Sequence, residues 1–238
     1  MPPSLQLNPA LATAQLASEF QAHGRLQVPD FLAATTADYL YQLLLDHQHW
    51  NLTYNEAGEH FESPVAAFDA LQPMQKQQFM SAIYRRARDQ FQYVFKQYYI
   101  TQALQLGEEP GHPMHPLQAF MNSEAVLAFM RTLTGQSDIR SADTYASRYE
   151  AGHFLTRHDD RHDKHDRVAA YVISMTPDWN PDWGGYLSFF DAAGNVQEAY
   201  RPSFNTLNIF LVPAPHAVQL VAPFAGHART SYLGWLHR

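Results

Sequence analysis

Short strand-like runs fill most of the chain between residues 142 and 236, and this feature limits the possible folds more than any other. The runs are rich in Tyr, Val, Ile and Ser, and Gly, Pro and Asn separate them, a pattern typical of antiparallel strands joined by turns. The runs cover residues 142–156, 168–176, 186–191, 206–212, 217–221 and 229–236. Because a sheet must bury one face, we expect the second half of the chain to form a β-sandwich or jelly roll.

The residues before this β unit are mostly spaced as in helices. A short strand-like stretch at 25–32 is an exception. Apolar residues recur every four positions through 73–99, which predicts one long amphipathic helix packed on a flat surface. Helices are expected at residues 9–20, 36–45, 73–99 and 117–133. Helices followed by strands predict an α+β protein in which the helices brace the sheet.

The length of the chain, 238 residues, suits one compact domain, because a single core grows to roughly 250 residues before chains divide. We expect one domain over 1–238, with helical support and the first strands in 1–140 and the β core with the functional site in 141–238. Apolar residues make up 46% of the chain and charged residues 16%, which excludes the composition of a disordered protein.

Charge and cysteine content narrow the function classes. The net charge of −7 provides no overall field that would attract nucleic acid or an anionic membrane, so neither is expected as a partner. The chain has no cysteine, so any metal must be bound through nitrogen and oxygen atoms. No apolar run approaches the ~20 residues that span a bilayer, and no signal-like segment is present, so a cytoplasmic location is expected.

Three residues in the second half have the character of a metal site. His158 and Asp160 form a His-x-Asp pair after a strand-like run, and an extended backbone would place both side chains on one face. His216 lies between two later runs and offers a third ligand. Two histidines and one carboxylate make the facial triad of non-haem Fe(II), which leaves coordination positions open for co-substrate and oxygen. Zinc with the same ligands stays an open alternative.

A carboxylate-binding pair is predicted on the last strand-like run. Period-two alternation directs Arg229 and Ser231 to the same face of a strand. A guanidinium forms a two-pronged, charge-assisted contact with a carboxylate, and the serine hydroxyl adds one donor. A facial triad beside such an arginine suits a chelating 2-oxoacid that carries a second carboxylate.

With these motifs in order, the sequence resembles the Fe(II)/2-oxoglutarate-dependent oxygenases, and within them the prolyl-hydroxylase-like branch that acts on protein substrates. The matching segments are 149–160, Arg167 with 171–174, 183–187, 204–205, 216–218 and 229–235. The resemblance implies a double-stranded β-helix fold. It also implies hydroxylation coupled to decarboxylation of 2-oxoglutarate, with succinate and CO2 as products.

The same resemblance assigns roles to residues of this chain. It implies that the three triad residues bind Fe(II) and that Arg229 pairs with the distal carboxylate of 2-oxoglutarate, assisted by Tyr149 and Ser231. Molecular oxygen is the second co-substrate, and ascorbate is a candidate cofactor. The implied substrate is a prolyl residue of a protein or peptide, for which the translation machinery is one source.

Three other functions fit the sequence. The chain could hydroxylate a free amino acid or small metabolite within the same family. It could be a cupin-like metal-binding protein without 2-oxoglutarate chemistry, which would have no need of Arg229. It could also be a non-catalytic β-sandwich binding module, which would show no metal-dependent binding of 2-oxoglutarate.

Residues beside these motifs receive structural or peripheral roles. His162 and His165 are expected on a solvated loop that shapes the substrate entrance, and Trp183 beside that entrance. Arg167 begins a strand-like run and is interpreted as a salt-bridging residue on a sheet edge. Thr206 and Asn208 share one face of a strand-like run that leads toward His216, and either is a candidate for the border of the pocket.

Overall fold

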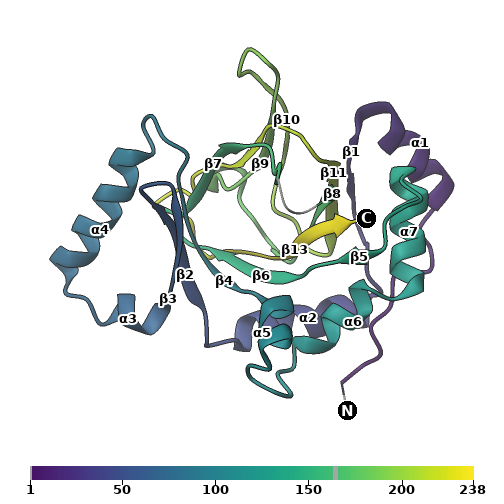
Figure 1. Cartoon of the computed structure of the whole chain (residues 1–238), viewed down its shortest axis with the longest axis horizontal. Helices are drawn as coiled ribbons and strands as arrows, with labels where there is room; N and C mark the ends of the chain where they lie inside the picture. The colour runs from purple at the N-terminus through teal and green to yellow at the C-terminus, as the bar shows by residue number, and fades with distance from the viewer. Residues whose placement is uncertain (1, 163–165) are drawn as a thin grey trace.

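The computed structural model describes residues 2–162 and 166–238, and in it one antiparallel sheet curls into a nearly closed barrel with helices outside it (Figure 1). The strands are β1 (Arg25–Val28), β2 (Asn51–Glu56), β3 (Glu59–Pro64), β4 (Tyr93–Tyr98), β5 (Ser141–Ala142), β6 (Tyr145–Tyr149), β7 (Phe154–His158), β8 (Arg167–Ser174), β9 (Leu187–Phe190), β10 (Val196–Tyr200), β11 (Thr206–Leu211), β12 (His216–Val218) and β13 (Arg229–His237). The helices are α1 (Thr13–His23), α2 (Ala34–Asp46), α3 (Val65–Asp69), α4 (Pro73–Arg86), α5 (Ile100–Leu106), α6 (His115–Met121) and α7 (Glu124–Thr134), with a 3-10 turn η1 (Pro181–Trp183). The predicted α+β class is confirmed.

The two ends of the sheet meet through side chains. The strand order is β1-β11-β8-β13-β6-β4-β7-β12-β9-β10, so β1 and β10 are the ends of this path. Arg25 of β1 places its Nε 2.6 Å from Oε2 of Glu198 in β10. The Arg25 guanidinium also lies 4.9 Å from the centre of the Phe189 ring in β9. Arg25 therefore connects β1 with β9 and β10 across this seam.

The predicted long helix over 73–99 is wrong in its second half. Helix α4 ends at Arg86, and residues Tyr93–Tyr98 form strand β4 between β6 and β7. The spacing of four that joins Phe91 to Phe95 also satisfies a period of two, so it does not distinguish a helix from a strand. The first half of the prediction is correct, because Ile83 is fully buried and packs with Val94 on the sheet.

The predicted helix over 117–133 is two helices, α6 and α7. Asn122 leaves the helical path and binds Ala142 of β5 through both its amide nitrogen and its amide oxygen. Ser123 then begins α7 by accepting a hydrogen bond from the Val126 backbone N–H at 3.4 Å. As expected, the helix ends at Gly135, whose φ of 69° suits glycine.

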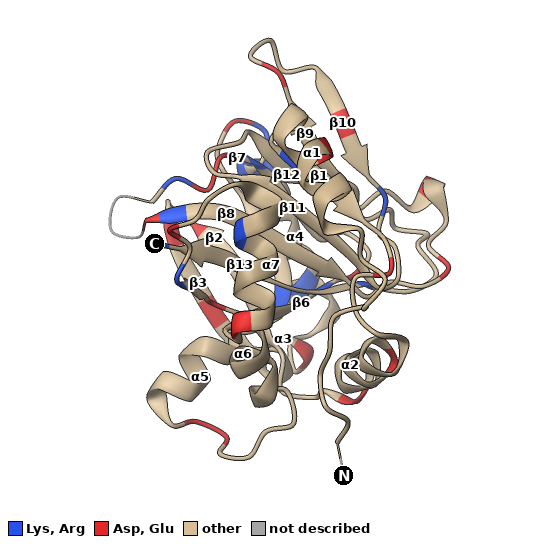
Figure 2. Ribbon diagram, turned by 90° about the vertical axis from the view of Figure 1, so that its right-hand side faces the viewer, with Lys and Arg blue, Asp and Glu red and all other residues tan. Residues whose placement is uncertain are grey.

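Most helices cover the same side of the sheet. Helices α1 and α7 lie beside each other next to β1 (Figure 2). On β11, Leu207 and Ile209 pack in the same buried cluster as residues of these helices, whereas Phe210 lines the interior of the barrel. This alternation is what a strand with two buried faces requires. None of the helices in the described part of the chain is both long and apolar enough to cross a membrane.

Candidate metal centre

Strands β7 and β12 bring two of the predicted metal ligands together. His158 is the last residue of β7 and His216 is the first of β12, and the two are directly paired in the antiparallel register. Their ring centroids lie 4.1 Å apart. The pairing of two short strands therefore places both imidazoles at one end of the barrel wall.

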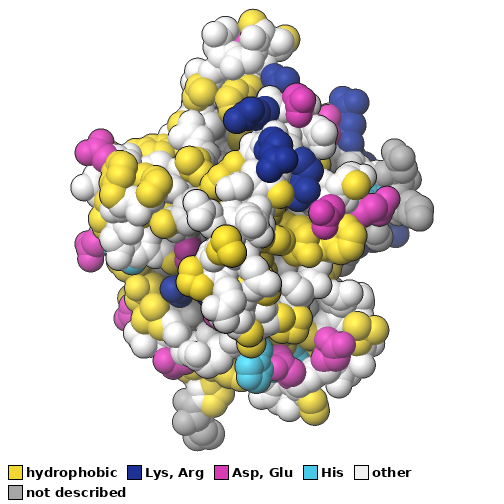
Figure 3. Space-filling model, turned by 90° about the vertical axis from the view of Figure 1, so that its left-hand side faces the viewer, with side chains coloured by type: hydrophobic (Ala, Val, Ile, Leu, Met, Phe, Trp, Pro, Cys, Tyr) yellow, Lys and Arg dark blue, Asp and Glu magenta, His cyan; other side chains and the backbone are white. Residues whose placement is uncertain are grey.

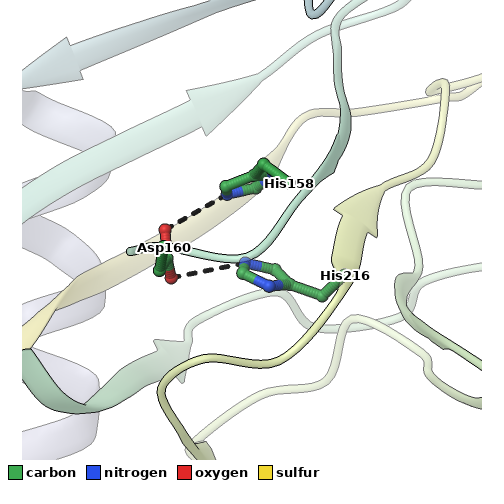
Figure 4. A group of neighbouring side chains, drawn as sticks. All are labelled: His158, Asp160 and His216. Carbon is green, nitrogen blue, oxygen red and sulfur yellow. Dashed lines mark ion pairs between the residues drawn. The ribbon is translucent and has the colours of Figure 1, made fainter. Parts of the chain in front are cut away.

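Asp160 turns back toward both histidines. Its backbone has a φ of 62°, in the left-handed region, so the extended backbone predicted through residue 160 is wrong. The turn places Oδ1 of Asp160 3.2 Å from Nε2 of His158 and Oδ2 3.4 Å from Nε2 of His216 (Figure 4). One nitrogen or oxygen from each of the three side chains lies within 4.8 Å of the other two.

Backbone carbonyl groups orient both imidazole rings. Nδ1 of His158 lies 3.0 Å from the Thr156 carbonyl oxygen, and Nδ1 of His216 lies 2.8 Å from that of Ala214. A carbonyl oxygen only accepts, so each Nδ1 carries the proton and each Nε2 directs a lone pair at the Asp160 carboxylate. Acceptors that face one another in this way are stabilised by a cation between them, which is how histidine ligands are held in metal sites.

The ionisation of the three groups suits a metal ligand set. Burial, together with repulsion from His158, lowers the pKa of His216 to about 4, so this imidazole is neutral at pH 7. Burial opposes the negative charge of Asp160, but the two histidines outweigh this effect and lower the pKa of the carboxyl group. A carboxylate and a neutral imidazole are the forms that bind metal. The donor set fits Fe(II), and zinc is equally compatible with these atoms.

A cavity of about 890 Å³ inside the barrel contains the three residues and the predicted carboxylate-binding residues. Arg229, Ser231 and Tyr149 all line it. Strand β13 shows the predicted alternation, because Tyr232, the residue after Ser231, does not line the cavity and donates a hydrogen bond to the Leu40 carbonyl at 2.9 Å. All six residues that the sequence analysis singled out as candidates therefore line the same cavity.

Arg229 is a buried cation without a counter-ion among the described residues. It lies directly opposite Tyr149 in the β13–β6 register, and its guanidinium carbon is 5.1 Å from the centre of the tyrosine ring. Only 4% of the residue is exposed, its Nε has no hydrogen-bond partner, and no carboxylate in the described part of the chain forms an ion pair with it. Burial lowers the pKa of Arg229. An unpaired buried guanidinium is costly, so the site fits an anionic ligand such as the distal carboxylate of 2-oxoglutarate.

Ser231 lies beside a second buried hydroxyl group, that of Ser147, which the sequence did not indicate. Its Oγ is 3.4 Å from Oγ of Ser147, the residue opposite it in β6. Ser147 also lines the cavity and is almost fully buried. An alternation signal for Ser147 was present, because Tyr149 two positions later faces the same side.

Arg167 differs from its interpretation as an edge residue. Strand β8 lies between β11 and β13, in the interior of the sheet. Arg167 lines the cavity, stacks its guanidinium 3.5 Å from the centre of the Trp235 ring, and donates from Nη1 to the Asp160 carbonyl at 3.2 Å. It thus supports the turn that carries Asp160.

Two further predictions, about residues at the entrance and border of the cavity, are wrong. Trp183 does not line the cavity and packs edge-on against Trp179, with ring centroids 5.3 Å apart. Thr206 is buried outside the cavity and donates to the Phe204 carbonyl. His162 is exposed and lines the cavity, in agreement with its expected place, whereas His165 lies outside the described residues.

The wall formed by β4, β2 and β3, in that order, carries polar residues that sequence reasoning missed. Glu62 accepts hydrogen bonds from Gln97 and from His60. Nδ1 of His60 lies 2.7 Å from the Tyr93 hydroxyl. Tyr93, Phe95 and Gln97 line the cavity in alternation, so the misassigned helix concealed this wall.

Comparisons with known proteins agree with this geometry. Residues 144–237 match the family model of the 2OG-Fe(II) oxygenase superfamily. The structure is similar to a prolyl-4-hydroxylase from Pseudomonas putida, with 21% identity, a TM-score of 0.60 and coverage of 95% of this chain and 98% of that chain. None of the curated proteins compared with the chain matches it in sequence.

Two other solved structures share the fold. An oxidoreductase of the 2OG-Fe(II) oxygenase family from Burkholderia pseudomallei has 14% identity and a TM-score of 0.61, over 98% of this chain and 93% of that chain. A prolyl hydroxylase from Trichoplax adhaerens, in complex with a peptide fragment of the hypoxia inducible factor oxygen degradation domain, has 16% identity and a TM-score of 0.62, over 94% and 88%.

The fold and the sequence of the second half of the chain both resemble one superfamily. The match covers β6 to β13 and includes the three metal-ligand candidates. It confirms the resemblance to the 2-oxoglutarate-dependent oxygenases, and the structural neighbours confirm the double-stranded β-helix fold. The chain has the fold of the 2OG-Fe(II) oxygenases, and residues 144–237 carry the sequence pattern of that superfamily.

Proposed function

We propose that this chain is an Fe(II)- and 2-oxoglutarate-dependent dioxygenase that hydroxylates a prolyl residue of a protein substrate and releases succinate and CO2. In this proposal residues 1–238 act as one oxygenase domain. One observation carries it: the His158, Asp160 and His216 group shares a cavity with Arg229, a buried arginine without an ion-pair partner among the described residues. A metal-binding protein without a 2-oxoacid would have no use for that unpaired cation.

The side chains that line this cavity would have different roles in the proposed reaction. His158, Asp160 and His216 would hold the metal on one side, and Arg229, with Ser231 and Tyr149, would orient 2-oxoglutarate. Bound Fe(II), 2-oxoglutarate and O2 would supply the oxidising chemistry. The apolar wall near the triad includes Phe210, which is 1% exposed and lies 4.6 Å from the His216 ring, centre to centre. Such a wall limits the access of water.

The prolyl specificity rests on a smaller set of observations. Two of the similar structures are a prolyl-4-hydroxylase and a prolyl hydroxylase with a bound peptide. The cavity mouth also carries the exposed aromatic side chain of Phe91, whose ring centroid is 5.6 Å from that of His158. An aromatic face beside the metal suits a pyrrolidine ring. Hydroxylation of a free amino acid is the alternative within the same chemistry.

The deciding experiment is anaerobic addition of Fe(II) and 2-oxoglutarate to metal-free protein. We expect the weak visible charge-transfer band of a 2-oxoacid chelated to ferrous iron. The band should vanish in His216→Ala and persist in His23→Ala, a control at the exposed end of α1. A folded protein that shows no band would overturn the proposal.

A second measurement addresses the substrate. Succinate release should increase when a proline-containing peptide is added and should not increase with free L-proline. The reverse result would favour the amino-acid hydroxylase.

A further inference from the structure

Strands β2 and β3 extend the sheet beyond β4, and one carboxylate of this extension faces the metal cavity. On the outer side, Leu52 and Val94 pack with Ile83 of α4, and Figure 3 views the molecule from the side on which α4 lies. Neighbouring residues of a strand face opposite sides, so Phe95 of β4 faces inward. Glu62 of β3 lies at the same level of the sheet as Phe95, and both line the metal cavity.

Glu62 is a carboxylate without a lysine or arginine partner among the described residues. Its ion-pair contact is with Nε2 of His60, 3.0 Å from Oε1, and His60 is a cation only when it is protonated. The two other carboxylates that line the cavity, among the residues described, have partners or another role. Asp159 pairs with Arg161, and Asp160 belongs to the candidate metal ligands. Glu62 therefore gives the cavity a negative charge that is available to a ligand.

The hydrogen bonds around Glu62 leave acceptors available in the cavity. Nε2 of Gln97 and Nε2 of His60 both donate to Oε1 of Glu62, so Oε2 has no partner among the described residues. Because Gln97 donates through its amide nitrogen, its amide oxygen remains as an acceptor. The side chain of Glu62 is 26% exposed, so a ligand can reach it. An ammonium or guanidinium group, which has several N–H donors and a positive charge, complements this arrangement.

Glu62 and the candidate metal ligands line the same cavity but are well separated. Phe91, just before β4, is at the metal end, because its ring centroid lies 5.6 Å from that of His158. Glu62 is two strands away from β4, at the level of Phe95, which it reaches through the register partner Thr53. With a rise of ~3.3 Å per residue and ~4.8 Å between strands, this places Glu62 on the order of 15 Å from the metal ligands. An extended peptide covers such a distance in about four residues, or fewer when a long side chain contributes.

We propose that Glu62 determines substrate specificity by binding a positively charged nitrogen group that lies a few residues from the reacting residue of the substrate. This inference rests on the proposed function and narrows its substrate to a basic segment of polypeptide. The group is the side chain of a lysine or arginine, or the free amino terminus of the substrate. A free amino acid is too short to reach both the metal and Glu62. The bound cation would use the free Oε2 and supply the counter-ion that the described residues do not provide.

The test uses alanine-rich peptides with one proline, a fluorescein label at the carboxyl end and an acetylated amino terminus. Each carries one lysine, placed between two and five residues before or after the proline, and a matched peptide has uncharged norleucine in its place. Anisotropy is measured with Fe(II) and 2-oxoglutarate under anaerobic conditions. We expect at least one lysine position to bind about tenfold more tightly than its norleucine match, with a preference that weakens at high salt. Norleucine peptides without the acetyl group show whether a free amino terminus provides the charge instead.

Variants of Glu62 test whether this residue causes the preference. Glu62→Gln should remove it, because the amide has the same size but no charge. Glu62→Lys should invert it, so that a peptide with glutamate at the same position binds better than the lysine peptide. Glu59→Gln is the matched control, because Glu59 is on the same strand and does not line the cavity. Melting curves establish that each variant is folded.

Three outcomes would overturn the specificity proposal: equal binding of the charged and uncharged peptides at every position, no binding of any peptide, or a preference that persists in Glu62→Gln. The charge-transfer band, recorded in the same samples, separates the two hypotheses. A band without a preference for a charged peptide sinks the specificity proposal alone, and a missing band sinks the proposed function.

Discussion

The Tyr84 hydroxyl donates a hydrogen bond to the Gly152 carbonyl oxygen at 3.0 Å and so joins α4 to the turn between β6 and β7. This turn connects Tyr149, beside Arg229, to the strand that ends in His158. The contact therefore links the outer helix to the segment that positions both ends of the candidate site. It also leaves little space around Gly152, whose φ is 85°.

Gly152→Ala should lower the free energy of unfolding by about 1–3 kcal/mol, because alanine is strained at this φ and its methyl group would collide with the Tyr84 hydroxyl. Urea denaturation measures the loss. Tyr84→Phe alone should cost about 1 kcal/mol for the lost hydrogen bond. Since Tyr84→Phe also removes the colliding atom, the double variant should be more stable than the sum of the two losses implies. Strict additivity would contradict the collision.

Arg229→Met should stabilise the protein in the absence of ligand, by about 1–3 kcal/mol, because it removes a buried charge that has no counter-ion among the described residues. We expect 2-oxoglutarate to raise the melting temperature of the wild-type protein with metal bound, and the same change should abolish this rise. Melting curves with and without the oxoacid test both effects. Destabilisation of the ligand-free protein would show that Arg229 has a structural partner.

Asp160→Ala should remove most of the stabilisation by divalent metal, since it deletes the only carboxylate in the candidate set. Asp159→Ala is the matched control, because this neighbouring carboxylate pairs with Arg161 instead. Isothermal titration with Mn(II) should show binding to the wild type and to Asp159→Ala. Equal affinity in all three proteins would reject Asp160 as a ligand.

Stability should decrease as the pH falls below about 6.5. Burial lowers the pKa of His153 to about 4, from an ordinary value of 6.5, and its Nδ1 accepts a hydrogen bond from the Glu150 N–H. Between these pH values His153 binds a proton in the unfolded chain but not in the folded chain. The contribution of neutral His153 to the free energy of unfolding is therefore fully present above pH 6.5 and decreases as the pH falls toward 4. A shift of this size corresponds to about 3 kcal/mol at the acid end. His153→Asn, which keeps an acceptor, should reduce the dependence measured by denaturation of metal-free protein at pH 7 and pH 5, and His216, whose pKa burial also lowers to about 4, should retain part of it.

Much of the candidate site was predictable because short-range rules determine it. Arg229 and Ser231 share a face by strand alternation, which can be read from the sequence alone. The meeting of His216 with His158 depends instead on the β7–β12 register, which joins segments far apart in the sequence. The rest depended on pairing between distant segments. Nothing local reveals that Arg167 begins a central strand, and so it was mistaken for an edge residue.

The helix–strand error at 73–99 has a similar cause. Apolar residues spaced four apart satisfy both periods, and only the pairing of β4 with β2, β6 and β7 selects the strand. Strand β10 was not predicted at all. Four of its five residues are not buried, so its sequence lacks the apolar alternation that indicates a strand. Its position depends on pairing with β9 and on the contact of Glu198 with Arg25.

The left-handed backbone at Asp160 has an evolutionary consequence. Aspartate and asparagine tolerate this conformation better than other residues with side chains, and of the two only aspartate brings a negative charge. A mutation to glutamate would keep the charge but lose the backbone preference, and a mutation to glycine would do the opposite. Two independent demands on one codon thus select the same amino acid, which leaves this position fewer acceptable replacements than a ligand on a regular strand.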